Sequence, residues 1–166
     1  MSVKKPLADY YPNGEKKIVG TSINGVIQGP IIAWHENGKI KSEINTKNGK
    51  MDGLVTHYFD NGQKCFEANY KNGKKDGLEI RWWSNGQKCT EANYKNGKKD
   101  GLVIIYHENG QKHVKGTYKD GDYDGLLVGW YDNGQKEKEG KLVKKKAVGK
   151  WTLYNEDGTI KEVKEY

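Results

Sequence analysis

The twelve residues EANYKNGKKDGL occur at positions 67–78 and again at positions 91–102. The interval is 24 residues, and Asn-Gly pairs follow the same interval along nearly the whole chain. Each position of an ordinary globular core has its own environment. Recurrence at a fixed interval therefore indicates a repeat protein, in which equivalent residues meet equivalent neighbours. One full unit, residues 53–76, reads GLVTHYFDNGQKCFEANYKNGKKD.

Three series of turn residues keep this period. One Asn-Gly series runs without a slip from Asn13 to Asn133, and a second starts at Asn24 and fails at Lys144-Lys145. Single glycines recur from Gly29 to Gly149. We expect one repeat domain over residues 1–166, whose first and last units act as caps. The expected units lie near residues 5–28, 29–52, 53–76, 77–100, 101–124, 125–148 and 149–166.

The turn series predict the fold class. Asn-Gly between short stretches of alternating polar and apolar residues is a strong signal for a β-hairpin. Each unit has room for two strands of about 6 to 8 residues, and Gly or Pro interrupts the chain too often for helices. The sequence therefore predicts an all-β fold, an elongated single-sheet antiparallel meander of about six to seven β-hairpin repeats.

The apolar pattern also predicts a register. Apolar side chains alternate along residues 54–58 and along residues 66–70. A three-residue loop at 60–62, with a type I turn and a G1 bulge, would pair Tyr58 with Lys64 and unite both sets on one face. We expect the other face to be mixed and half wet. It would carry three columns: Tyr11, His35, Phe59, Trp83, His107 and Tyr131; Val55, Glu79, Val103 and Leu127; and Glu67, Glu91, Lys115 and Glu139.

The unit pattern G-L-x-x-x-Y/W-x-x-N-G-Q-K-x-x-E-x-x-Y-K-N-G-K-x-D resembles the MORN-repeat variant found in bacteria, and within it the YwqK-type antitoxin family. The resemblance covers about residues 5–164 and is clearest in the units that begin at Gly53, Gly77 and Gly101. It implies an all-β repeat protein that binds a partner. In the antitoxin case the implied partner is a toxin encoded nearby.

No group of residues predicts catalysis or a metal site. Cys65 and Cys89 lack a C-x-x-C partner, and strands that are second neighbours lie about 9–10 Å apart, so we expect two free thiols. His107 and His113 would approach across one turn, but no third ligand accompanies them. The aspartates that precede the repeated glycines are explained by turn chemistry. We therefore expect no enzyme, no catalytic residue, no metal and no cofactor.

Charge and composition restrict the partner and the compartment. The net charge is +7, and every basic residue except Arg81 is lysine. Base readout and bidentate phosphate contacts prefer arginine, so we do not expect nucleic acid as the partner. No apolar run approaches a transmembrane segment and the N-terminus lacks the apolar part of a signal peptide, so we expect a cytoplasmic protein. The densest basic group is a candidate site for anions or lipid, or else a solvated cap: Lys144, Lys145, Lys146 and Lys150.

These observations favour a non-enzymatic scaffold that binds a protein. Our leading hypothesis is an antitoxin or immunity protein that neutralises a cognate bacterial toxin by direct binding through the mixed face. Aromatic residues beside charged ones are typical of such binding patches. The candidate partner-binding residues are Phe59, Glu79, Arg81, Trp83, Ile105, His107 and Tyr131. The alternative is a peripheral module that binds anionic lipid through its lysines, a role often proposed for MORN repeats.

Overall fold

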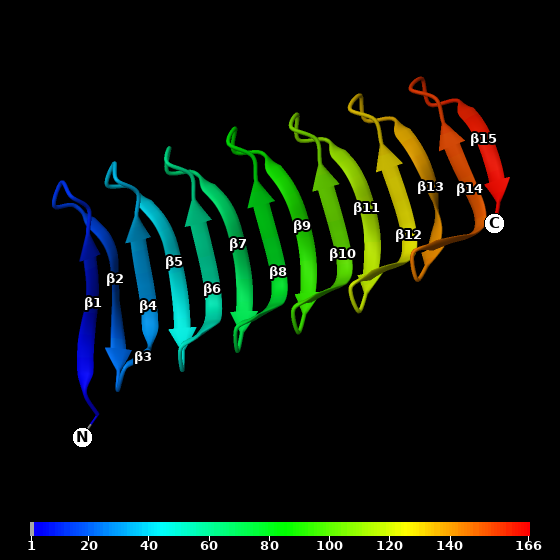
Figure 1. Ribbon diagram of the computed structural model, residues 1–166. Helices are drawn as coiled ribbons and strands as arrows, with labels where there is room; N and C mark the ends of the chain where they lie inside the picture. Colours follow the sequence, from blue (N-terminus) through cyan, green and yellow to red (C-terminus); the bar gives the residue numbers. More distant parts are fainter. Residues whose placement is uncertain (1) are drawn as a thin grey trace. The chain divides into compact units, whose positions relative to one another are not determined.

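The computed structural model describes residues 2–166, and all regular elements in this range are β-strands. Its 15 strands form one antiparallel sheet in the order β1-β2-β4-β5-β6-β7-β8-β9-β10-β11-β12-β13-β14-β15, with β3 paired only to β2 (Figure 1). The predicted all-β meander of hairpin repeats is confirmed.

Contacts divide the chain into two units, unit 1 at Met1–Gly77 and unit 2 at Leu78–Tyr166. A single repeat domain over the whole chain stays a prediction. Unit 1 contains β1 (Lys4–Tyr10), β2 (Lys16–Ile23), β3 (Val26–Ile27), β4 (Gly29–Trp34), β5 (Ile40–Lys47), β6 (Lys50–Tyr58) and β7 (Lys64–Lys71). β8 (Lys74–Trp82) crosses the boundary. Unit 2 continues with β9 (Lys88–Lys95), β10 (Lys98–Tyr106), β11 (Lys112–Lys119), β12 (Asp122–Trp130), β13 (Lys136–Val143), β14 (Lys146–Tyr154) and β15 (Ile160–Glu165).

The longer Asn-Gly turn has the predicted conformation. Between β6 and β7, the Gly62 amide donates to the Phe59 carbonyl at 2.9 Å, and the Phe59 amide donates to the Gln63 carbonyl at 2.8 Å. Gly62 has a φ of 90°, the left-handed conformation of a G1 bulge. Tyr58 pairs with Lys64, so the register expected next to the turn is confirmed.

A second bulge follows and reverses the predicted faces. Tyr58 pairs with Lys64, but its neighbour His57 pairs with Phe66, so Cys65 is an extra residue on β7. One extra residue turns the rest of a strand over, because side chains alternate with a period of two. Phe66, Ala68 and Tyr70 therefore point away from the face of Tyr58. The expectation that both apolar sets share one face is wrong.

We name the two faces by their residues. The leucine face carries Leu54, Thr56 and Tyr58 of β6 and also Glu67, which lies opposite Thr56 on β7. The equivalent residues of other repeats belong to the same face. The alanine face carries Val55 and its partner Ala68 with their equivalents. Glu91 and Glu139 also lie on the leucine face, opposite Ile104 and Val128, which corrects their expected place on the mixed face.

The alanine face holds the core, contrary to the expectation of a half-wet surface. The most deeply buried apolar side chains belong to it, at 1–2% exposure: Val55, Ala68, Ala92 and Val103. Side-chain volumes compensate across paired strands: Ala92 lies opposite Val103, Gly116 lies opposite Leu127, and Gly140 lies against the ring of Trp151. Close fits of this kind stabilise a sheet through cross-strand packing.

Candidate binding surfaces

A column of hydrogen bonds between tyrosine and glutamate runs along the leucine face. In unit 2, Tyr106 donates to the Glu91 carboxylate at 2.5 Å, and Lys88 forms an ion pair with the same carboxylate at 3.1 Å. The next repeat but one makes the same contacts with Tyr154, Glu139 and Lys136. In unit 1, Tyr58 donates to Glu43 at 2.6 Å.

These contacts keep the carboxylates of Glu91 and Glu139 ionised, because they lower the pKa of both. Burial alone would raise the pKa of Glu91, but the hydrogen bonds from Tyr106 and Lys88 outweigh it and lower that pKa below its usual value. Burial and the bond to Glu91 raise the pKa of Tyr106 to about 12. Glu91 and Glu139 are thus each engaged by two partners within the sheet, which suits a structural role better than proton transfer.

A second column, on the alanine face, ties each repeat to the next. In unit 2, Nε2 of His107 lies 3.1 Å from the Trp130 carbonyl, and the Tyr131 hydroxyl donates to the Tyr154 carbonyl at 2.8 Å. In unit 1, the side chains of Tyr11 and His35 likewise contact a backbone carbonyl 23 residues further along the chain. Two members of the column make no such bond. Phe59 has no polar side-chain group, and the indole Nε1 of Trp83 is buried without a hydrogen-bond partner among residues 2–166.

The predicted partner-binding residues share the alanine face within unit 2, and Phe59 holds the equivalent position in unit 1. Glu79 is only 3% exposed, in the column otherwise held by Val55 and Val103, and Arg81 donates to it at 2.8 Å through Nε. Arg81 itself is exposed, while the other members are half-buried: Phe59, Trp83, Ile105, His107 and Tyr131. Their part in binding stays a prediction.

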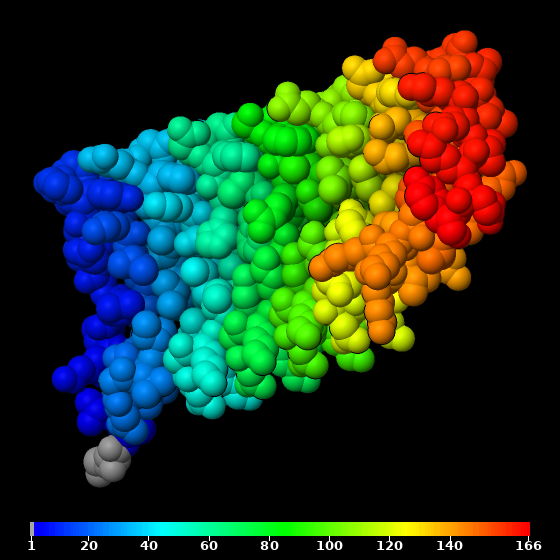
Figure 2. All heavy atoms as spheres, turned by 45° about the vertical axis from the view of Figure 1, so that its right-hand side comes forward, coloured from blue at the N-terminus to red at the C-terminus, as the bar shows by residue number. Residues whose placement is uncertain are grey.

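The predicted lysine group is divided between a turn and a strand. Lys144 and Lys145 form the turn between β13 and β14 with φ of 46° and 67°, and Lys145 forms an ion pair with Asp122 at 2.5 Å. Side chains in the orange part of the chain, which contains this turn, stand out from the surface in Figure 2. Lys150 lies on β14, away from the turn, on the leucine face.

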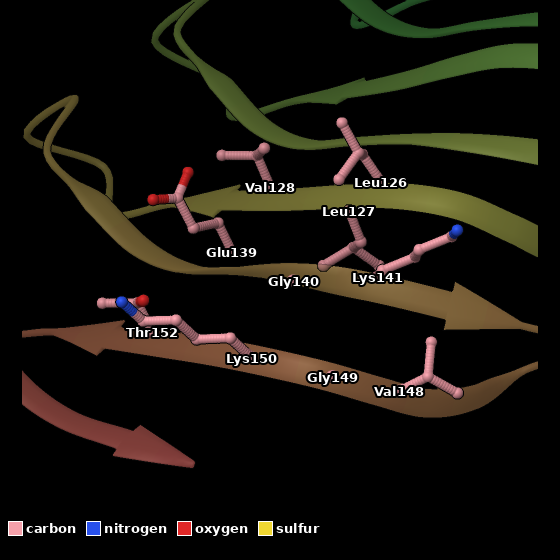
Figure 3. A pocket seen from close by; sticks show the side chains of 10 residues that line it. All are labelled: Leu126, Leu127, Val128, Glu139, Gly140, Lys141, Val148, Gly149, Lys150 and Thr152. Atoms are coloured by element: carbon pink, nitrogen blue, oxygen red, sulfur yellow. The ribbon is translucent and has the colours of Figure 1, made fainter. Parts of the chain in front are cut away.

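Two open hollows occupy the leucine face, and the sequence pattern did not predict them. The unit 2 hollow, of about 500 Å³, lies over β12, β13 and β14 (Figure 3). Its lining includes Leu126, Val128, Glu139, Lys141, Val148 and Lys150. The unit 1 hollow, of about 230 Å³, is lined by residues including Pro30, Ile32, Glu43, Asn45, Leu54 and Thr56.

The next features concern possible metal ligands, the two cysteines and membrane-spanning helices. Among residues 2–166, no three His, Cys, Asp or Glu side chains are grouped so as to hold a metal ion. His107 and His113 do meet, as predicted, with ring centroids 4.3 Å apart. Cys65 and Cys89 are half-buried thiols that do not form a disulfide. The described chain contains no helix that is long and apolar enough to cross a bilayer.

Comparison with known proteins gives one family. The MORN repeat variant matches residues 27–48, 51–72, 75–96, 99–120 and 147–166, which together make up more than half of the chain. Residues 121–146, where lysines replace the Asn-Gly turn, lie outside the matched ranges. No curated protein sequence matches the chain. The matched repeats and the hairpin meander show that the chain belongs to the MORN repeat variant family.

Proposed function

We propose that this protein is a non-enzymatic scaffold that binds another protein, and specifically an antitoxin or immunity protein that neutralises a cognate bacterial toxin by direct binding. MORN repeats are generally modules that bind proteins or lipids, which supports the broader part of the proposal. The resemblance to YwqK-type antitoxins supports the narrower part. Such an antitoxin would act in the cytoplasm, where it meets a toxin made in the same cell.

The observation that carries the proposal is the exposed apolar surface of the leucine face. Leu54 is 41% exposed and Leu126 is 70% exposed, although both belong to regular strands. Large apolar side chains that recur on one face mark a surface for a partner, because covering them removes apolar area from water. Glu139, which lines the same hollow as Leu126, is already paired with Lys136, so a partner would not leave it buried and unpaired.

The test is capture of the partner from the native cell at high salt. The tagged full chain would be incubated with lysate in about 1 M NaCl, where surface electrostatics are screened within about 3 Å. We expect one stoichiometric protein that arrests growth when expressed alone and is harmless when co-expressed with the chain. Loss of all partners at high salt, or a captured protein that leaves growth unchanged, would contradict the antitoxin role.

Two variants would show which face of the sheet binds the partner. Leu126→Asp alters the leucine face, and Trp83→Ala alters the predicted patch on the alanine face. The exposure of Leu126 leads us to expect weaker capture with Leu126→Asp. Weaker capture with Trp83→Ala alone would instead assign binding to the residues predicted from the sequence.

A second candidate function, binding to anionic lipid, is favoured by the projecting lysine turn. Lys144 and Lys146 have no ion pair within the described chain, whereas Lys145 is held by Asp122. Each free lysine near an anionic surface contributes about 1 kcal/mol of binding energy. Sedimentation with phosphatidylserine vesicles should then decrease steeply with salt and with Lys144→Glu. Absence of vesicle binding at low salt would exclude this role.

A further inference from the structure

We infer that the unit 2 hollow receives an extended segment of the partner protein in which an apolar side chain lies between carboxylates. The inference rests on the proposed function for the existence of a protein partner. It adds the place of contact on this chain and the chemistry of the segment that fits there.

The repeat itself builds the hollow. The two hollows correspond residue by residue at an interval of 96 positions, so that Val128, Glu139 and Thr152 of one match Ile32, Glu43 and Thr56 of the other. The same backbone bulges and the same Tyr–Glu column surround both hollows. Unit 1 therefore provides an internal comparison for the chemistry of unit 2.

The two hollows differ at their rims. Asn45 and Leu54 line the unit 1 hollow, and the Asn45 amide donates to the Leu54 carbonyl at 2.9 Å. Lys141 and Lys150 hold these positions in unit 2. The hollow in unit 1 thus has a neutral rim, and the hollow in unit 2 has two added positive charges.

The lysines of the unit 2 rim form no ion pair within the described residues, although Glu165 is the cross-strand neighbour of Lys150. Glu139 is already engaged by Lys136 at 2.8 Å and by the Tyr154 hydroxyl. Neither Lys141 nor Lys150 forms an ion pair with any described residue, and Figure 3 shows their side chains extending in opposite directions along the hollow. A partner that carries a carboxylate toward each end would complement both charges.

The outer strands of the hollow, β12 and β14, contribute apolar side chains. Leu126, at 70% exposure, is the most exposed of the large apolar side chains on the leucine face. Val128 lies two residues along the same strand, and Val148 lies on β14, across Lys141 from Leu126. In an extended segment, every second side chain points to the same side, at intervals of about 6.8 Å. One apolar side chain over Leu126, with acidic side chains before and after it, fits this order of charges. The headgroups of a fluid bilayer hold no fixed alternation of charged and apolar groups, so we favour a protein segment over lipid.

Peptide probes on the full chain test this inference. The first probe is Ser-Glu-Glu-Leu-Glu-Glu-Ser; two controls replace its leucine by serine or its glutamates by lysine. With isotope-labelled protein, amide shifts at Gly140 and Gly149 report binding at the hollow. We expect the first probe to bind at least about tenfold more tightly than either control. Equal binding of the serine control, or no shift at these glycines, would overturn the inference.

Variants separate this inference from the proposed function. Lys141→Glu with Lys150→Glu should abolish probe binding, whereas the matched unit 1 variant Asn45→Glu should not change it. Amide dispersion in the same spectra checks that each variant is folded. If the lysate partner still binds the charge-reversed variant, the proposed function stands and the inference is wrong. If anionic vesicles shift Gly140 and Gly149 while the peptide does not, the hollow is a lipid site and the inference is likewise wrong.

Discussion

The Tyr106 hydroxyl donates a 2.5 Å hydrogen bond to the Glu91 carboxylate on the adjacent strand β9. Tyr58 and Glu43 make the equivalent bond in unit 1. The tyrosines that make these bonds recur at an interval of 48 residues, with tryptophan at the intermediate positions, so the repeat places one charge-assisted hydrogen bond on the leucine face in every second hairpin unit. Because a sheet of one layer has little buried apolar volume, we expect such bonds to contribute measurably to stability.

Tyr106→Phe should lower the free energy of unfolding by about 1 kcal/mol, since it removes one hydrogen bond to a partly exposed charged group. Urea denaturation would measure the change. A double-mutant cycle with Glu91→Ala, which removes the acceptor, should give a coupling of at least about 0.5 kcal/mol. Strict additivity of the two single variants would show that the bond contributes nothing to stability.

The turn between β13 and β14 is strained, and relieving the strain should stabilise the protein. Lys144 and Lys145 have φ of 46° and 67°, where the other turns of this series have Asn or Asp followed by Gly. A left-handed conformation costs an ordinary side chain roughly 1–2 kcal/mol. Lys144→Asn with Lys145→Gly should therefore raise the free energy of unfolding by about 1–2 kcal/mol. The loss of the Lys145–Asp122 ion pair reduces this gain by the small contribution of an exposed pair.

Thermal unfolding would check this second prediction. The matched control is the reverse change in a regular repeat, Asn96→Lys with Gly97→Lys, which should lower the melting temperature. If the Lys144→Asn and Lys145→Gly variant melts at the same temperature as the natural chain, the lysines are not under strain.

Much of the fold was predictable because the turn residues can be recognised directly in the sequence. Asn-Gly at two fixed phases specified hairpins, and the three-residue loop specified the pairing of Tyr58 with Lys64. The faces were not predictable in the same way, because the bulge at Cys65 leaves no turn residue in the sequence. An error of one residue there exchanged the faces and moved Glu91 away from Tyr106 in the expected structure. The hollow at Leu126 was missed for a further reason: it depends on three strands at once rather than on one hairpin.

Acidification should weaken the fold before any carboxylate titrates. Burial, and then the charge of Lys41, lower the pKa of His57 below its usual 6.5. Near and below pH 6.5 the unfolded chain therefore binds more protons at this site than the folded chain, so stability decreases as the pH falls from 6.5 toward the folded pKa. Burial, and then His107, shift the pKa of His113 in the same direction.

The measurement is the free energy of unfolding in urea between about pH 7.5 and 5.5. His57→Asn should reduce the slope of stability against pH, and the additional change His113→Asn should reduce it further. An unchanged slope in the double variant would show that other groups account for the pH dependence over this range.

The compensation between Gly140 and Trp151 gives a prediction about the alanine face. A Cβ atom at Gly140 would lie 2.1 Å from the Trp151 ring, so Gly140→Ala must displace a ring whose Nε1 donates to the Lys141 carbonyl at 3.1 Å. Overpacking of this kind costs roughly 1–3 kcal/mol, which we expect as the loss of unfolding free energy in urea. Adding Trp151→Val should recover part of that loss, because Ala opposite Val is the arrangement of Ala92 and Val103. If the double variant is no more stable than Gly140→Ala alone, contact between these two side chains does not explain the glycine.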